Sequence, residues 1–193
     1  MSKMMSCVVP VCGNYSGTHG LISIILQLKN QTYKDIEIIP IICCIENISF
    51  VQELLGVPLN EFPHDVFGGN KKDPFYEKCN VGMRMAWGIY VGFFSGDDYY
   101  SRHYLEKMLR RMEKDGVHLM YCNFRSHYGQ NAETVGSVEQ GHITSGSFIV
   151  RLDTVKKLGG FPPVGMGDFE FVKKVEESGF KIAKLDEMPY VHR

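Results

Sequence analysis

Hydrophobic residues along this chain alternate between continuous apolar runs and runs with the spacing of one helix face. Three continuous runs, of the kind found in strands covered on both faces, lie at 6–11, 36–45 and 90–94. Between the first two, apolar residues recur at helical spacing at Leu21, Ile24, Ile25 and Leu28. Thr18 stands before them as a candidate helix N-cap. The succession of strand, helix and strand is typical of a parallel α/β sheet.

The remainder of the chain continues this alternation. Further strands are predicted at 62–67, 117–122, 147–151 and 180–185. Further helices are predicted at 50–55, 73–87, 101–114, 154–158 and 169–178. Ser101 is a candidate N-cap, and residues 125–140 are polar without a clear period, which indicates a loop with room for one hairpin. We therefore expect an α/β fold in which helices flank a central, mostly parallel mixed sheet.

Length and charge limit the classes of function. A chain of 193 residues, 44% of them hydrophobic, can bury one sizeable core, so a single domain over 1–193 is expected. The formal net charge of −1 gives no basic excess for nucleic acid and favours a small-molecule or carbohydrate partner. No segment approaches the roughly 20 apolar residues that cross a bilayer, and the N-terminal apolar run begins too early for a secretory signal. A cytoplasmic protein with no transmembrane segment is predicted.

The six cysteines lie mostly within apolar runs, such as the run at 41–45. The chain lacks the two matching Cys-x-x-Cys pairs that a structural zinc site commonly uses. A disulfide framework is not expected in an intracellular chain of this size. Buried free thiols are therefore predicted.

Two adjacent carboxylates, Asp97 and Asp98, follow directly after the predicted strand at 90–94. In an open α/β sheet, ligands bind beyond the carboxyl ends of the strands. Adjacent carboxylates repel each other unless a cation compensates, and hard oxygen ligands suit Mg²⁺ or Mn²⁺. A Gly-Asp-Asp sequence is also ordinary turn chemistry, so a solvated turn is the alternative.

Three segments in order resemble family 2 glycosyltransferases with the GT-A fold. Residues 76–98, YEKCNVGMRMAWGIYVGFFSGDD, resemble the block in which an Arg-Asn helix leads into a strand and an Asp-x-Asp metal motif. Residues 8–41, VVPVCGNYSGTHGLISIILQLKNQTYKDIEIIPI, resemble the opening strand, helix and second strand. The C-terminal segment, which begins SGSFIVRLDTVKKLGGF, resembles the Gly-Gly-Phe turn and the helix with an Asp.

The resemblance implies a metal-dependent, inverting enzyme that uses a nucleotide-diphosphate sugar. UDP is favoured as the nucleotide, Mn²⁺ or Mg²⁺ as the cofactor, and a glycan, protein or lipid-linked hydroxyl as the acceptor. The nucleotide-binding half would be about 1–98, and the half for sugar and acceptor about 99–193.

By position, the resemblance assigns the metal to Asp97 and Asp98, with His192 as a further candidate ligand. Asp168 falls at the place of the general base, and Glu170 is the reserve. A helix N-cap is the alternative for Asp168, and a merely exposed histidine is the alternative for His192.

The remaining assignments concern the donor. Gly146 and Ser147 match a small-residue loop beside the donor sugar. The nucleotide contacts would come from Pro10, Cys12, Lys78, Asn80 and Arg84.

The sequence also departs from the family pattern. Cys43-Cys44 stands where an acidic pair usually grips the base, Cys79 replaces the Arg of the Arg-Asn pair, and Ser95 replaces the first Asp of the metal motif. Two other functions stay open. One is a nucleotidyltransferase, although the glycine-containing segment 12–17 has no Lys or Arg for phosphates. The other is a degenerate module that binds a nucleotide or glycan without catalysis.

Overall fold

The computed structural model describes residues 4–12, 17–45, 47–62, 74–126, 133–134, 136–162 and 167–192. Strands and helices alternate over these residues, as the hydrophobic pattern predicts. In its first half the elements are β1 (Met5–Cys12), α1 (Gly17–Lys29), β2 (Ile36–Cys43), α2 (Ile48–Leu55), β3 (Asn60–Glu61), α3 (Phe75–Met85) and β4 (Tyr90–Phe93). In its second half they are β5 (Tyr99–Tyr100), α4 (Tyr104–Asp115), β6 (Leu119–Ser126), β7 (Glu133–Thr134), η2 (Ser145–Ser147), β8 (Phe148–Arg151), α5 (Leu152–Leu158), α6 (Gly167–Glu177) and β9 (Ile182–His192).

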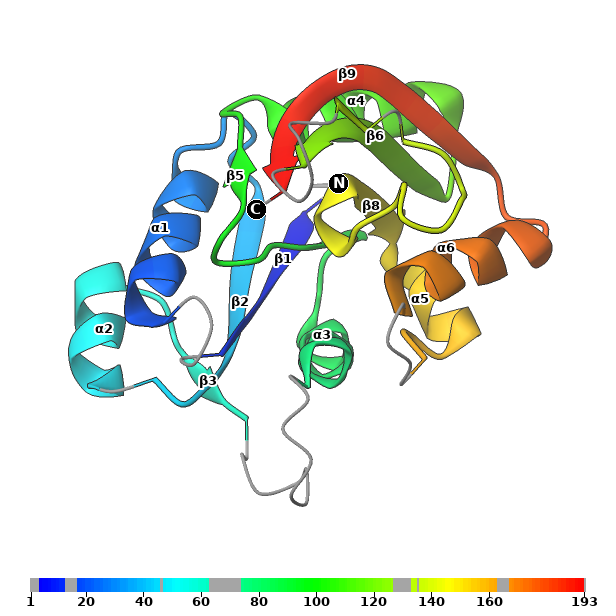
Figure 1. Ribbon diagram of the computed structural model, residues 1–193. Helices are drawn as coiled ribbons and strands as arrows, with labels where there is room; N and C mark the ends of the chain where they lie inside the picture. The colour runs from blue at the N-terminus through cyan, green and yellow to red at the C-terminus, as the bar shows by residue number, and fades with distance from the viewer. Residues whose placement is uncertain are drawn as a thin grey trace.

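One sheet joins all of these strands, in the order β3-β2-β1-β4-β8-β6-β9-β5, with β7 paired to β6 (Figure 1). The first four strands pair in parallel, and so do β6 and β9. Strand β8 enters antiparallel between β4 and β6, and β5 pairs antiparallel with β9. The predicted mixed α/β sheet is confirmed.

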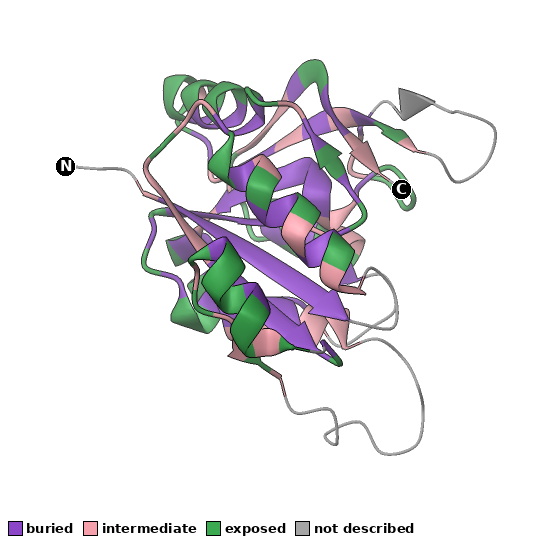
Figure 2. Ribbon diagram, turned by 90° about the vertical axis from the view of Figure 1, so that its left-hand side faces the viewer, coloured by how far each residue is buried: buried purple, intermediate pink, exposed green. Residues whose placement is uncertain are grey.

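Helices cover both faces of the sheet. The core on one face receives side chains from α1, α2 and α4, and the core on the other face receives them from α3, α5 and α6. Figure 2 shows buried strands through the middle of the molecule and exposed outer faces on the helices. In β1, successive residues alternate between the two cores, with Cys7 and Val9 on one side and Val8 on the other. A strand buried on both faces accounts for the continuous apolar run.

Some predicted boundaries were wrong. Strand β9 continues to His192 rather than ending at 185, because it pairs with β6 up to His192 and also with β5 at Tyr190 and Val191. Helix α1 begins at Gly17, so Thr18 lies inside it. His103 is the N-cap residue of α4, and the N–H of Ser101 donates instead to the carbonyl of Pro189 on β9 (2.9 Å).

Short elements were the hardest to predict. Strand β3 lies just before the strand predicted at 62–67, of which residues 63–67 are outside the described part of the chain. The hairpin allowed for within 125–140 is present as the antiparallel pair of β6 and β7. Strand β5 and the 3₁₀ helix η2 were not predicted, since two or three residues carry no hydrophobic period.

The Gln-Thr-Tyr segment after α1 holds this helix against α4. Gln31 is buried, donates to the carbonyl of Ser101 (2.9 Å) and accepts from the N–H of Leu105 (3.1 Å). The Thr32 hydroxyl donates to Glu106 (2.7 Å). The acidic pair lies on the segment between β4 and α4. These contacts fix the end of this segment and the start of α4.

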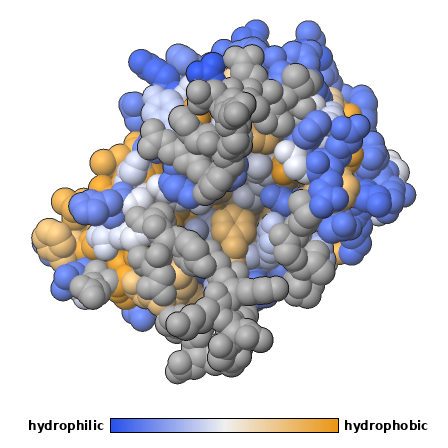
Figure 3. Space-filling view, viewed as in Figure 1, coloured by the Kyte–Doolittle hydropathy of each residue, from blue (hydrophilic) through white to orange (hydrophobic). Residues whose placement is uncertain are grey.

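Exposed apolar side chains gather on the outer faces of α1 and α2, at the left of Figure 3. Leu26, Phe50 and Leu54 are the large ones, while Val51 and Leu55 on the inner face of α2 are buried. Among the described residues, no helix combines the length and apolar character that crossing a bilayer requires.

Candidate active site at the end of strand β4

The acidic pair lies on a tight turn between β4 and β5. The N–H of Asp98 donates to the carbonyl of Ser95 (3.3 Å), and the Ser95 hydroxyl donates to Oδ1 of Asp97 (2.5 Å). Asp97 is exposed, whereas Asp98 is only 4% exposed. The two neighbouring carboxylates therefore have different surroundings.

Three side chains from the C-terminal half surround the carboxylate of Asp98; we call Tyr100, Tyr190 and His192 the Asp98 cage. The hydroxyls of Tyr190 (2.8 Å) and Tyr100 (3.3 Å) donate to Oδ2 of Asp98. Nδ1 of His192 lies 3.1 Å from Oδ1 and 3.1 Å from the Tyr190 hydroxyl. Tyr190 and His192 share one face of β9, since residues two apart on a strand point the same way.

The charge of Asp98 keeps the cage protonated. Burial, and after it the charge of Asp98, raises the pKa of Tyr100 and of Tyr190 well above 10.0. Burial by itself lowers the pKa of His192, but the hydrogen bond and charge of Asp98, with the charges of Asp97 and Asp168, raise it above 6.5 overall. The raised pKa values favour the protonated form of all three side chains, which can donate to the carboxylate of Asp98.

The segment that contains η2 packs against this cage. The Thr144 hydroxyl donates to the Tyr190 hydroxyl (3.3 Å), and Tyr104 donates to the carbonyl of Gly146 (2.9 Å). A Cβ at Gly146 would lie 2.3 Å from the hydroxyl of Tyr100 and 2.8 Å from Tyr190. Gly146 is therefore required for close packing against the tyrosines.

Asp168 lies in the first turn of α6, on the other side of η2. Its carboxylate accepts hydrogen bonds from the N–H groups of Phe169 (2.8 Å) and Ser145 and from the hydroxyl of Tyr76. Burial raises the pKa of Asp168 above 3.8, and these hydrogen bonds act in the opposite direction. Because α6 begins at Gly167, Asp168 is a first-turn residue rather than the N-cap.

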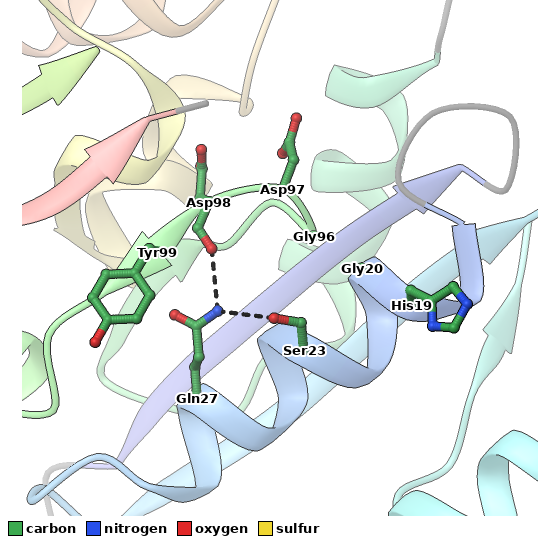
Figure 4. A pocket seen from close by; sticks show the side chains of 8 residues that line it. All are labelled: His19, Gly20, Ser23, Gln27, Gly96, Asp97, Asp98 and Tyr99. Carbon is green, nitrogen blue, oxygen red and sulfur yellow. Dashed lines mark hydrogen bonds between the residues drawn. The ribbon is translucent and has the colours of Figure 1, made fainter. Parts of the chain in front are cut away.

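The backbone of the acidic turn borders a cleft of about 450 Å³ against α1. Its lining includes His19, Ser23, Gln27 and the acidic pair. Figure 4 shows the two carboxylates pointing to the same side, away from α1, while Gln27 donates to the backbone carbonyl of Asp98 (3.1 Å). Gln27 also accepts from the N–H of Tyr100 (2.8 Å), so it holds the turn in place.

Sequence reasoning missed Gln27, Tyr76, Tyr100, Thr144 and Tyr190. The positions of Tyr100 and Tyr190 in the sequence could have indicated their roles. Tyr100 follows directly after the acidic pair, and Tyr190 precedes His192 by two residues, the spacing of one strand face.

Two of the expected nucleotide contacts lie away from this turn. Asn80 donates to the carbonyl of Phe161 and accepts from its N–H (both 2.9 Å), so its amide closes the turn after α5. With the exposed Arg84, it lines a separate hollow of about 530 Å³ beside Lys156. The described contacts thus give Asn80 a structural role and do not bring either residue to the acidic pair.

The other expected residues lie near the strand ends or around η2. Pro10 and Cys12 are buried at the end of β1, and Lys78 is buried on α3. Ser147 is buried, and its hydroxyl donates to the carbonyl of Thr144 (2.8 Å) and accepts from the same residue's N–H (3.1 Å), as in a helix cap. Glu170 is exposed on α6.

Comparison with known proteins agrees with this geometry. The model of the family described as glycosyl transferase family 2 matches residues 66–175, more than half of the chain. This segment includes the acidic turn, η2 and Asp168. A comparison with curated protein sequences gives no match.

Several solved structures have a similar fold. TarS from S. aureus superposes with a TM-score of 0.76 at 16% identity, over 97% of this chain and 36% of that one. TarS 1–349 in complex with UDP-GlcNAc gives 0.73 at 17% identity, over 97% and 57%.

The mannosyltransferase PcManGT from Pyrobaculum calidifontis, in complex with GDP-Man and Mn²⁺, gives a TM-score of 0.72 at 14% identity, over 97% and 56%. The chain therefore spans between about a third and three fifths of the length of these three proteins. At such identities the likeness establishes the fold. From the family match and this fold, the chain belongs to glycosyl transferase family 2 and has the GT-A fold.

Proposed function

We propose that this domain transfers a sugar from a nucleotide-diphosphate sugar to a hydroxyl group, with inversion at the anomeric carbon. The observation that carries the proposal is the placement of two carboxylates against one short segment. Tyr100 and Tyr190, which donate to Asp98, pack against Gly146 in η2. Asp168 accepts a hydrogen bond from the N–H of Ser145 in the same segment. Residues 1–98 would bind the nucleotide, and residues 99–193 would supply the acceptor side and close over Asp98.

A divalent ion, Mn²⁺ or Mg²⁺, would be held by Asp98, Asp97 and His192, and His192 would release to solvent the proton that Asp98 favours when no ion is bound. The donor set suits such an ion, because carboxylate oxygens are hard ligands and imidazole is a common partner for transition metals. Asp98 is fixed by its cage, and the exposed Asp97 points to the same side (Figure 4). When bound, the ion supplies positive charge against the diphosphate leaving group. The Mn²⁺ in the PcManGT complex supports this assignment.

Asp168 would take the proton from the acceptor hydroxyl. Its raised pKa makes the carboxylate a stronger base than an exposed aspartate, while the hydrogen bonds from Tyr76 and Ser145 hold its position. Inversion follows when the hydroxyl attacks from the side opposite the leaving diphosphate. Glu170, on the exposed side of α6, is the reserve candidate.

The donor would be recognised at the ends of β1 and β2, where Pro10, Cys12 and Lys78 lie. A UDP-sugar is our first choice, supported by the UDP-GlcNAc in one structural relative, and a GDP-sugar is the second, supported by the GDP-Man in another. The acceptor would be a hydroxyl of a glycan, a protein or a lipid-linked sugar.

The test is donor turnover with UDP-, GDP- and dTDP-sugars, with and without Mn²⁺. We expect Mn²⁺-dependent transfer or donor hydrolysis, and its loss in the Asp97→Ala, Asp98→Ala double variant. Donor binding alone is measured by thermal shift, since a ligand at 100 times its Kd stabilises the native state by about 2.7 kcal/mol. Unchanged turnover in the double variant rejects the metal role.

A binding module without catalysis is the second candidate. It is favoured by Cys79 in place of the family's Arg and by the structural use of Asn80. Calorimetric binding of a nucleotide sugar, with no turnover across the donor panel, would support this candidate over the enzyme.

A further inference from the structure

Three thiols meet at the carboxyl ends of β1 and β2; we call Cys12, Cys43 and Cys44 the thiol cluster. Cys12 and Cys43 are direct neighbours in the parallel register of the two strands. The sulfur atoms of all three lie within 4.8 Å of one another. Each cysteine is a free thiol. Strand pairing thus gathers ligand atoms that are far apart in the sequence.

An unusual backbone conformation brings Cys44 into this cluster. Successive residues of a strand point to opposite faces, so an extended Cys44 would face away from the thiol of Cys43. Instead, Cys44 has a φ of 56°, in the left-handed region that residues other than Gly, Asn and Asp rarely adopt. Such a conformation costs about 1–2 kcal/mol, and strain of this kind concentrates at binding sites.

A buried positive charge lies beside the cluster. Lys78 is fully buried on α3, and its Nζ lies 3.7 Å from the sulfur of Cys43. A buried ammonium group favours anionic neighbours. Burial raises the pKa of Cys43 to about 12, and the charge of Lys78 acts against this rise. The surroundings therefore suit thiolates once a further cation replaces the thiol protons.

We propose that the thiol cluster is a binding site for a thiophilic divalent ion of the Zn²⁺ type, separate from the oxygen site at Asp98. Three S–H bonds are replaced by three S–Zn bonds, and three protons leave to solvent. The resulting group carries one net negative charge, which Lys78 balances. Cys12 (6% exposed) and Cys43 (5% exposed) form the inner side, while the exposed Cys44 leaves the fourth position open to water.

The softness of its sulfur ligands distinguishes this site from the oxygen site proposed to hold a divalent ion at Asp98. Thiolates select Zn²⁺ or Cu⁺, whereas carboxylates suit Mg²⁺ and Mn²⁺. Cys12 and Lys78 are also among the donor contacts proposed above, so zinc and donor would compete at this edge of the sheet. Zinc content is measured without donor, so its outcome is separate from that of the transferase assay.

The experiment measures metal content rather than activity. Reduced protein is dialysed against Zn²⁺ with excess Mg²⁺, and the bound zinc is quantified; Cd²⁺ titration then reports sulfur ligation by charge-transfer absorption. We expect one Zn²⁺ per chain. Cys44→Asn, which removes the thiol but keeps a residue that tolerates the left-handed region, should weaken binding by about 100-fold, since even changes outside the ligand set cost 10–100-fold. Cys122→Ala, at a buried thiol outside the cluster, should bind normally.

Two results would overturn the proposal. One is equal zinc uptake, or none, in the folded wild type and Cys44→Asn, with folding checked by circular dichroism. The other is a disulfide between two of the three cysteines that forms without reductant and persists with Zn²⁺ present, because it would assign the cluster to redox chemistry.

Discussion

Two carboxylates near η2, Asp98 and Asp168, are both largely withdrawn from water but are held in opposite ways. Side chains with raised pKa values surround Asp98, namely two buried tyrosines and a histidine. Around Asp168, backbone N–H groups and Tyr76 donate, yet burial still raises the pKa of Asp168 itself. The first environment surrounds the carboxylate with hydrogen-bond donors, and the second suits a group that gains and loses a proton.

The two environments share one structural element. The η2 segment contacts the Asp98 cage through Thr144 and Gly146, and it contacts Asp168 through the N–H of Ser145. A substitution at one carboxylate therefore leaves the other undisturbed only if η2 keeps its position. Substitutions at each carboxylate and at η2 test whether the two can be separated.

Replacing Asp98 should have the largest effect on kcat. Asp98→Asn keeps the shape of the side chain but removes the charge, and we expect kcat with Mn²⁺ to fall by about 1,000-fold, the upper range for loss of one electrostatic contact at an active site. The measurement is steady-state transfer or donor hydrolysis. Asp186→Asn, at an exposed carboxylate on β9, is the control and should retain full activity. Comparable losses in both variants would contradict the assignment.

Replacing the proton acceptor should lower the rate somewhat less. We expect Asp168→Asn to reduce kcat by about 100-fold, the lower end of the range for a general base, with donor affinity unchanged. In the wild type, kcat/KM should fall on the acid side at a pH above 3.8, because lowering the pH through the raised pKa protonates the base. Asp168→Asn should lack this acid limb.

The raised pKa of Asp168 also affects the free energy of unfolding, which depends on pH in the opposite direction to the rate. A carboxyl group whose pKa is raised on folding contributes stability below its unfolded pKa and loses that contribution as the pH rises through the folded value. Glu170→Gln, at an exposed carboxylate two residues further along α6, is the control for the rate loss in Asp168→Asn. A larger rate loss in Glu170→Gln than in Asp168→Asn would transfer the role of base to Glu170.

Local pattern was enough for most of the long elements, β9 excepted, and for the acidic pair. Continuous apolar runs located β1, β2 and β4 because each is buried on both faces, and helical spacing located α1. The pair Asp97-Asp98 was predicted at a strand end and lies there. These features depend only on residues that are close together in the sequence.

The contacts around Asp98 and the thiol cluster depend on pairing between segments that are far apart in the sequence. Tyr190 and His192 reach Asp98 only because β9 inserts between β6 and β5, an order that no local period specifies. The thiol cluster was missed for the same reason, since Cys12 meets Cys43 through the register of β1 and β2. The prediction of buried free thiols is confirmed for five of the six cysteines and is wrong for Cys44, which is exposed on a left-handed turn.

Gly146→Ala tests the segment that joins the two carboxylates. The added Cβ would overlap the Tyr100 hydroxyl and the Tyr190 ring, so we expect a loss of about 2 kcal/mol in the free energy of unfolding, as for overpacked cores. The measurement is urea denaturation. Because both carboxylates depend on η2, kcat should fall as well. Ser145→Ala keeps the N–H that Asp168 accepts and is the control; an equal loss there would show that the effect is not steric.

Tyr76→Phe should have the smallest effect, and it addresses Asp168 alone. Burial and the charge of Asp168 raise the pKa of Tyr76, so its hydroxyl remains a donor to that carboxylate. This hydrogen bond lowers the pKa of Asp168, and its loss should therefore raise that pKa further and move the acid limb of kcat/KM to higher pH. The cost in stability should be about 1 kcal/mol, that of one hydrogen bond. Tyr190→Phe removes a matching hydroxyl from Asp98 and should leave the acid limb in place, because the Tyr190 hydroxyl contacts Asp98, Thr144 and His192. A shift of the limb to lower pH in Tyr76→Phe, or an equal shift in both variants, would mean that the two carboxylates titrate as one unit rather than holding separate roles.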